Sequence, residues 1–72
     1  MEELKAFLAA KFPSIDFDRI DLIESGVLDS ITLVTLISLL EERYEIEITM
    51  DYIVPENFES VEAIWGLVDE LS

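Results

Sequence analysis

A chain of 72 residues forms one small domain, near the lower limit of length at which a hydrophobic core can form unaided. Hydrophobic residues make up 51% of the chain, which excludes an acidic disordered tail, and the absence of cysteine excludes disulfides and thiolate zinc sites. Seventeen acidic residues against four basic ones give a net charge of −13, which repels nucleic acids and anionic membranes and attracts partners rich in Lys and Arg.

The first predicted helix covers residues 2 to about 12. Leu4, Phe7 and Leu8 fall on one face at helical spacing, and Pro13 ends the helix. A long polar loop follows, in which Gly26 is predicted to be a turn residue with positive φ. The loop residues expected to contact the core are Ile15, Phe17, Ile20, Leu22, Ile23, Val27 and Leu28.

The clearest helix is predicted from residue 30 to about residue 44. Its length and its 3.6-residue hydrophobic period favour a helix over a strand, although β-branched residues are frequent in it. Asp29 precedes the run and is predicted to be its N-cap, with a carboxylate that accepts a hydrogen bond from a first-turn N–H. The expected buried stripe consists of Leu33, Leu36, Ile37, Leu40 and Tyr44.

The last third of the chain predicts a short helical turn, at residues 51 to 54 or 55 to 58, and a final helix at residues 61 to 71. Pro55 suits the start of a turn, Ser60 is predicted to cap the final helix, and Gly66 is expected on its outer side. The residues expected to point inward are Ile46, Ile48, Ile53, Val54, Phe58, Val61, Ile64, Trp65, Val68 and Leu71. Residues 1–72 are thus predicted to be a single all-α domain, a small four-helix bundle with three main helices, one short helix and a long first loop.

The residue types argue against an enzyme. A serine nucleophile needs a base such as His or Lys within reach, but the chain has no His, and Lys5 and Lys11 both lie in the first predicted helix. Carboxylate pairs could supply acid–base chemistry, and such an enzyme is one alternative. In so acidic a chain, however, carboxylate pairs arise by chance, and a domain this small leaves little room for a cleft that excludes water.

A calcium loop is the metal site that the sequence comes nearest to. The stretch "DFDRIDLIE" offers Asp16, Asp18 and Asp21. An EF-hand requires an oxygen ligand at loop position 5 and Gly at position 6, where this chain has Ile20 and Asp21. The pattern therefore predicts a solvated acidic loop and no metal site.

The remaining candidate site is Asp29–Ser30 in the stretch "ESGVLDSITL". Taken as a helix start alone, the pair is a cap followed by the first helical residue. At 100° per residue, Ile31 lies about 160° from Leu33, and Val34 about 100° from it. Ile31 is therefore predicted to face water, where an apolar residue beside an acidic surface indicates a docking patch.

This stretch resembles the acyl, aminoacyl and peptidyl carrier proteins. Their motif is Asp-Ser-Leu at the start of the second helix with a Gly shortly before it, and here it reads "GVLDSI", with Ile31 in the Leu position. The segments "LIESGVLDS", "LEERYEIEI" and "ENFESVEAI" also resemble the family, so that the likeness covers nearly the whole chain.

The resemblance implies that Ser30 bears a 4'-phosphopantetheine arm, transferred from coenzyme A by a separate magnesium-dependent transferase, with Asp29 adjacent to that metal or acting as the cap. The arm would hold an activated carboxylic acid as a thioester, so the chain would be a carrier and not an enzyme. The positions that match the family's docking surface for partner enzymes are Ile31, Val34, Glu41 and Glu42.

Fatty-acid carriers present acidic residues on the early part of the second helix. The corresponding positions here, which we expect to be exposed, are Thr32, Thr35 and Ser38, and none is acidic. This difference favours an amino acid or small acyl cargo, loaded by an adenylating ligase or an acyltransferase and passed to condensing or transfer enzymes. The alternative from another class is an acidic protein-interaction adaptor, or a nucleic-acid mimic, that never carries cargo.

The N-terminus "MEELKAFLAAKF" begins with acidic residues and lacks the apolar region of a signal peptide, and no apolar run is long enough for a membrane span. We therefore expect a cytoplasmic monomer without membrane insertion. The Met at residue 1 and the end shortly after the last predicted helix favour a stand-alone carrier.

Overall fold

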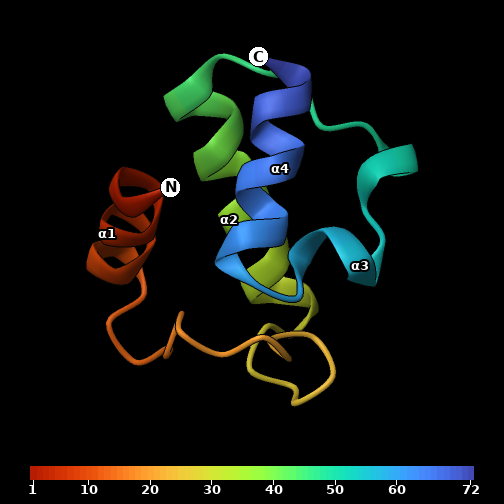
Figure 1. Ribbon diagram of the computed structural model, residues 1–72. Coiled ribbons are helices and arrows are strands. Elements are labelled where there is room, and N and C mark those ends of the chain that lie inside the picture. Colours follow the sequence, from red (N-terminus) through yellow and green to blue (C-terminus); the bar gives the residue numbers. More distant parts are fainter.

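The computed structural model describes all 72 residues and contains helices and no strands. The elements are α1 (Glu2–Lys11), α2 (Ser30–Tyr44), the 3₁₀ helix η1 (Met50–Tyr52), α3 (Pro55–Phe58) and α4 (Val61–Leu71). The predicted all-α class is confirmed. Of the two positions offered for a short turn, 55–58 is helical throughout, whereas in 51–54 only the first two residues are helical, as part of η1. Figure 1 shows α2 and α4 at the centre, α1 beside them, α3 next to the start of α4 and the long loop at one end.

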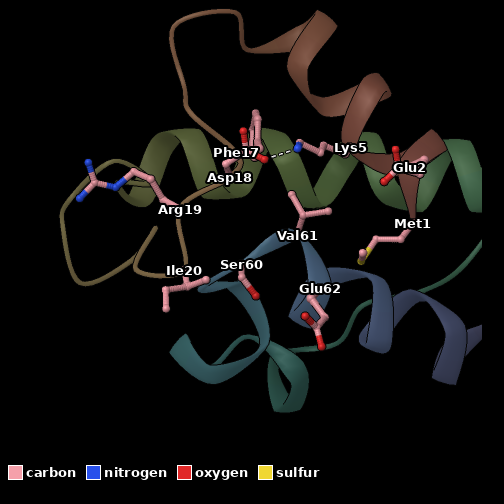
Figure 2. Close-up of a pocket in the computed structure, with 10 residues that line it drawn as sticks. All are labelled: Met1, Glu2, Lys5, Phe17, Asp18, Arg19, Ile20, Ser60, Val61 and Glu62. Carbon is pink, nitrogen blue, oxygen red and sulfur yellow. Dashed lines mark hydrogen bonds and ion pairs between the residues drawn. The ribbon is translucent and has the colours of Figure 1, made fainter.

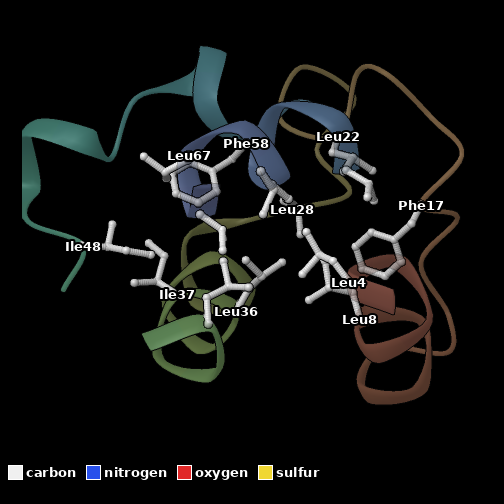
Figure 3. Packing of buried hydrophobic residues seen from close by; sticks show 14 residues of the cluster. Leu4, Leu8, Phe17, Leu22, Leu28, Leu36, Ile37, Ile48, Phe58 and Leu67 are labelled. Carbon is white, nitrogen blue, oxygen red and sulfur yellow. The ribbon is translucent and has the colours of Figure 1, made fainter. Parts of the chain in front are cut away.

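The core consists of 14 buried residues, all of them hydrophobic, and no polar side chain is buried. Each α-helix contributes to it, and the long loop contributes Phe17, Leu22 and Leu28 (Figure 3). The eight side chains shielded almost completely from solvent are Leu4, Leu8, Leu22, Leu36, Leu40, Phe58, Ile64 and Val68. Because the chain has no disulfide, this apolar contact is the main source of its stability.

The loop between α1 and α2 is held by backbone hydrogen bonds as well as by its buried side chains. The Leu22 N–H donates to the Glu59 carbonyl at 2.9 Å, which joins the loop to the junction of α3 and α4. The Leu28 N–H donates to the Leu22 carbonyl at 2.9 Å, and Gly26 turns the chain between them with φ 82°. These bonds fix the position of the residues that lead into α2.

Two residues predicted to point inward are exposed. Ile20 is 79% exposed, because the chain bends there: the Arg19 guanidinium folds back onto the Asp21 carboxylate with hydrogen bonds of 2.9 and 3.0 Å. Ile53 is 39% exposed and lies directly after η1, whereas Ile48, which precedes η1, is buried.

The core face of α4 is wider than the sequence pattern indicated. Val61, Ile64 and Val68 are buried as predicted, whereas Trp65 and Leu71 are half-buried against the core. Leu67 was not among the predicted core residues but is only 4% exposed. It is covered because α3 packs against α4, a contact that the hydrophobic period of α4 alone does not reveal.

The burial of Phe58 anchors α3, which is too short to be stable alone. We expect Phe58→Ala to lower the free energy of unfolding by about 3–5 kcal/mol, because it leaves a large cavity in the core. The measurement is urea unfolding followed by circular dichroism. Ile20→Ala, at an exposed apolar position, is the control and should change stability by no more than about 0.5 kcal/mol. Equal stability of the two variants would contradict this account of the core.

Candidate functional site

The start of α2 is a capped helix terminus. Asp29 has extended backbone angles, φ −82° and ψ 179°, and its Oδ1 accepts a hydrogen bond from the Thr32 N–H at 2.8 Å. Its backbone carbonyl accepts the N–H of Leu33 at 2.9 Å. The predicted cap is confirmed, and so are the predicted start and end of the helix at Ser30 and Tyr44.

The cap lowers the pKa of the Asp29 carboxyl group. The main cause is the hydrogen bond from the Thr32 N–H, and the Thr32 hydroxyl and the Ile31 N–H act in the same direction. A lowered pKa means that the folded state favours the carboxylate over the acid. The stabilisation is therefore complete above the ordinary pKa of Asp and is lost as the pH falls through the lowered value.

Ser30 is the first residue of α2, is exposed, and lies outside both surface cavities of the molecule. Its hydroxyl makes no hydrogen bond to another protein group. The two lysines are engaged elsewhere: Lys5 bonds to Asp18, and the Lys11 ammonium lies 5.8 Å from the centre of the Phe7 ring. Neither lysine is therefore placed beside the Ser30 hydroxyl, which is open to solvent.

The acidic residues of the long loop bond to near neighbours. Asp16 accepts the N–H of Asp18 at 3.0 Å, Asp18 pairs with Lys5, and Asp21 pairs with Arg19. No group of three or more acidic residues is placed to hold a metal ion. No helix has the length and apolar character needed to cross a membrane.

Two apolar side chains follow Ser30 on the outer face of α2. Ile31 is 80% exposed and Val34 is 63% exposed, as the helical geometry of the sequence predicted for Ile31. Thr35 lies beside them, and its hydroxyl donates to the Ile31 carbonyl at 3.1 Å, so that it does not present a free donor at this point. The apolar pair is therefore largely exposed near the serine.

Glu41 and Glu42, adjacent in the sequence, have different surroundings. Glu41 is half-buried, and its Oε2 accepts the N–H of Ile48 at 2.9 Å, while its carbonyl accepts the N–H groups of Glu45 and Ile46 at the end of α2. Glu42 is exposed and makes no ion pair. The structural role of Glu41 was missed at the sequence level, because its partner lies in a segment without a periodic pattern.

Among known protein families, the model of the phosphopantetheine attachment site matches residues 2–68. The chain belongs to this family, and it is a carrier-protein domain. The cofactor of the family is 4'-phosphopantetheine, attached covalently, and its members interact with phosphopantetheinyl transferases and biosynthetic enzymes and are generally non-catalytic. Neither the curated proteins nor the solved structures include a match to this chain.

The cap can be tested by replacing Asp29. We expect Asp29→Ala to lower the urea midpoint of unfolding at pH 7, because it removes the acceptor of the Thr32 N–H, whereas Asp29→Asn should retain most of the stability. The difference between the parent and Asp29→Ala should shrink as the pH falls through the lowered pKa of Asp29, when the carboxylate becomes protonated. A difference that stays constant down to that pH would rule out a charge contribution to the cap.

Substitutions can also distinguish the contributions of Glu41 and Glu42 to stability. Glu41→Ala should cost about 1 kcal/mol of stability, because it leaves the Ile48 N–H without its acceptor. Glu41→Gln keeps an acceptor oxygen and should cost less, and Glu42→Ala should leave the urea midpoint nearly unchanged. If Glu41→Ala were as stable as Glu42→Ala, the Glu41 carboxylate would have no structural role.

Proposed function

We propose that Ser30 is the attachment residue for phosphopantetheine, and that the chain carries an amino acid or a small acyl group loaded by an adenylating ligase. The observation that carries the proposal is the uncommitted, exposed Ser30 hydroxyl at the capped start of α2, in a chain of the phosphopantetheine family. When attached, the arm supplies the thiol that this chain lacks and on which a carboxylic acid is held.

The surroundings of Ser30 suit a phosphate. The N–H groups of Ser30 and Ile31 come too early in α2 to have a carbonyl acceptor within the helix. Together with the positive end of the helix dipole, they favour a negative group on the serine oxygen. Asp29 keeps this end of α2 ordered, and its carboxylate is exposed, so that a transferase-bound magnesium ion can approach it.

The docking surface for partner enzymes consists, in this proposal, of Ile31, Val34, Glu41 and Glu42. The apolar pair lies at the base of the arm, where a partner covers it on binding, and desolvated apolar contacts of this kind dominate the energy of small interfaces. Glu42 offers a free charge to a basic partner, which raises association rates more than affinity. Glu41 contributes less to the attraction of a basic partner, because its carboxylate already accepts a hydrogen bond from the Ile48 N–H.

The choice of cargo rests on the neutral residues of α2. Thr35 and Ser38 are exposed and Thr32 is half-buried, so the middle of this face presents hydroxyl groups instead of carboxylates. A partner that recognises carriers through an acidic α2 finds few charges there. This favours a ligase that docks on Ile31 and Val34 over the enzymes of fatty-acid synthesis.

The test is the intact mass of the protein after incubation with coenzyme A, magnesium and a broad-specificity phosphopantetheinyl transferase. We expect the gain of one phosphopantetheinyl group, lost in Ser30→Ala. Ser38→Ala is the matched control, because it removes another exposed hydroxyl from the same helix and should leave the gain unchanged. Circular dichroism verifies that both variants are folded.

The alternatives give other results. Modification that persists in Ser30→Ala would place the arm elsewhere, and no modification of the folded parent protein would favour the acidic adaptor. If the arm is attached, the cargo follows from incubating the holo protein with adenylating ligases and amino acids or short acids. Loading only by enzymes of fatty-acid synthesis would overturn the proposed cargo class while leaving Ser30 as the attachment site.

A further inference from the structure

The 3₁₀ helix η1 holds large apolar side chains away from the core. Met50, its first residue, is 86% exposed, and Ile53, directly after it, is 39% exposed. The Ile53 N–H donates to the Met50 carbonyl at 3.1 Å. Residues three apart in a 3₁₀ turn lie on the same side, so the two side chains form one apolar surface, here called the η1 surface.

Hydrogen bonds on both sides of η1 fix its position. Before it, the Ile48 N–H donates to the Glu41 carboxylate at 2.9 Å, and the Ile48 side chain is buried. At its end, the Asn57 side-chain amide donates to the Tyr52 carbonyl at 2.8 Å, and the Tyr52 ring packs against the core. The η1 surface is therefore built into the fold, and its exposure does not depend on a loose loop.

The part of the chain that contains η1 has no basic side chain. Asp51 lies within η1, and Glu47 and Glu56 flank it in the sequence; all three are exposed, and none forms an ion pair. Residues 44–72 contain no Lys or Arg, and their eight acidic residues are Glu45, Glu47, Asp51, Glu56, Glu59, Glu62, Asp69 and Glu70.

The four basic side chains of the molecule make their contacts within residues 1–43. Figure 2 shows one of these contacts, the ion pair of Lys5 and Asp18 beside a surface cavity of about 170 Å³ that Ile20 also lines. The others are Arg19 with Asp21, Arg43 with Glu3, and Lys11 over the Phe7 ring. In Figure 1, η1 lies at the edge of the molecule opposite α1. The charged groups beside the η1 surface are therefore carboxylates without a paired cation.

An apolar surface between unpaired carboxylates is complementary to a partner that presents apolar and basic side chains together. Nucleic acids and anionic membranes are repelled by the same carboxylates. A second copy of this chain is repelled as well, because each copy has a net charge of −13. The charge of the η1 surface thus favours one class of occupant, a basic protein segment.

We propose that the η1 surface binds a segment of a partner protein in which apolar side chains alternate with Lys or Arg. The apolar side chains pack on Met50 and Ile53, and the basic groups lie beside Asp51, Glu47 and Glu56. The partner thereby gains a contact in addition to the apolar pair on α2, which strengthens binding and fixes its orientation. The contact requires neither the arm nor Ser30.

The test uses the apo protein and three blocked five-residue peptides, with alternating Arg and Leu, Arg and Ser, or Glu and Leu, at constant ionic strength. Amide chemical shifts are followed by NMR. We expect saturable shifts at residues 47–56 with the Arg/Leu peptide, binding about 3-fold or more weaker with Arg/Ser, because it lacks apolar contact, and no saturable shifts there with Glu/Leu. Equal binding of Arg/Leu and Arg/Ser would overturn the proposal.

Variants separate the apolar and the charged halves of the contact. Met50→Gln should weaken the Arg/Leu peptide by about 3-fold and leave Arg/Ser unchanged, whereas Met50→Leu should restore binding. Asp51→Asn should weaken both peptides by about 2- to 5-fold. The matched controls are Ile20→Ala, at an exposed apolar residue of the long loop, and Glu70→Gln, at an exposed carboxylate of α4. All the substituted side chains are exposed, so the variants should keep the parent fold.

The outcomes are distinct from those for the carrier function. Shifts confined to residues 31–34 would show that the peptide binds only the apolar pair on α2, and would overturn the η1 surface even if Ser30 accepts the arm. Shifts at residues 47–56 that depend on protein concentration without a peptide would assign the surface to a second copy, which also overturns the proposal. A protein that fails to gain the arm but binds the Arg/Leu peptide at η1 would retain this inference alone.

Discussion

The burial of Leu22 and Leu28 is the constraint on which the rest of the structure depends. Residues 12–29 contain no regular helix, yet the course of this loop determines where Asp29 lies at the start of α2. The two leucines enter the same core as the helices, and backbone hydrogen bonds join Leu22 to Glu59 and Leu28 to Leu22. A loop that long would otherwise leave the cap and the serine free to move, because the chain has no cysteine to form a disulfide across it.

A core that takes only apolar side chains leaves every charge and hydroxyl on the surface. The proposed attachment at Ser30 requires that a transferase reach this serine, and Ser30 lies outside any cavity with its hydroxyl unbonded. The carboxylates divide into those with structural partners, such as Asp29 and Glu41, and those that are free, such as Glu42 and Glu62. Only the free carboxylates are available to attract a basic partner. Fewer charges can therefore take part in docking than the net charge of −13 suggests.

Much of this could be predicted from the sequence, because it depends on local geometry. Helix α2, its cap Asp29 and the cap Ser60 follow from side chains that bond within one turn. The exposure of Ile31 follows from its angle on the helix. The Glu41–Ile48 bond and the burial of Leu67 could not be predicted, because they depend on how a loop returns to α2 and on α3 covering α4.

The sequence by itself determined the class of fold, the capped start of α2 and the candidate serine, because periodicity, capping and the Asp-Ser motif are properties of short stretches. The tertiary structure decided which loop residues enter the core and which surfaces remain open. Ile20 illustrates the difference: its apolar side chain predicted burial, but the chain bends at this residue, with Arg19 and Asp21 paired on either side of it, and leaves it exposed. Only the packing of α1, the loop and α4 then places it at the rim of a cleft.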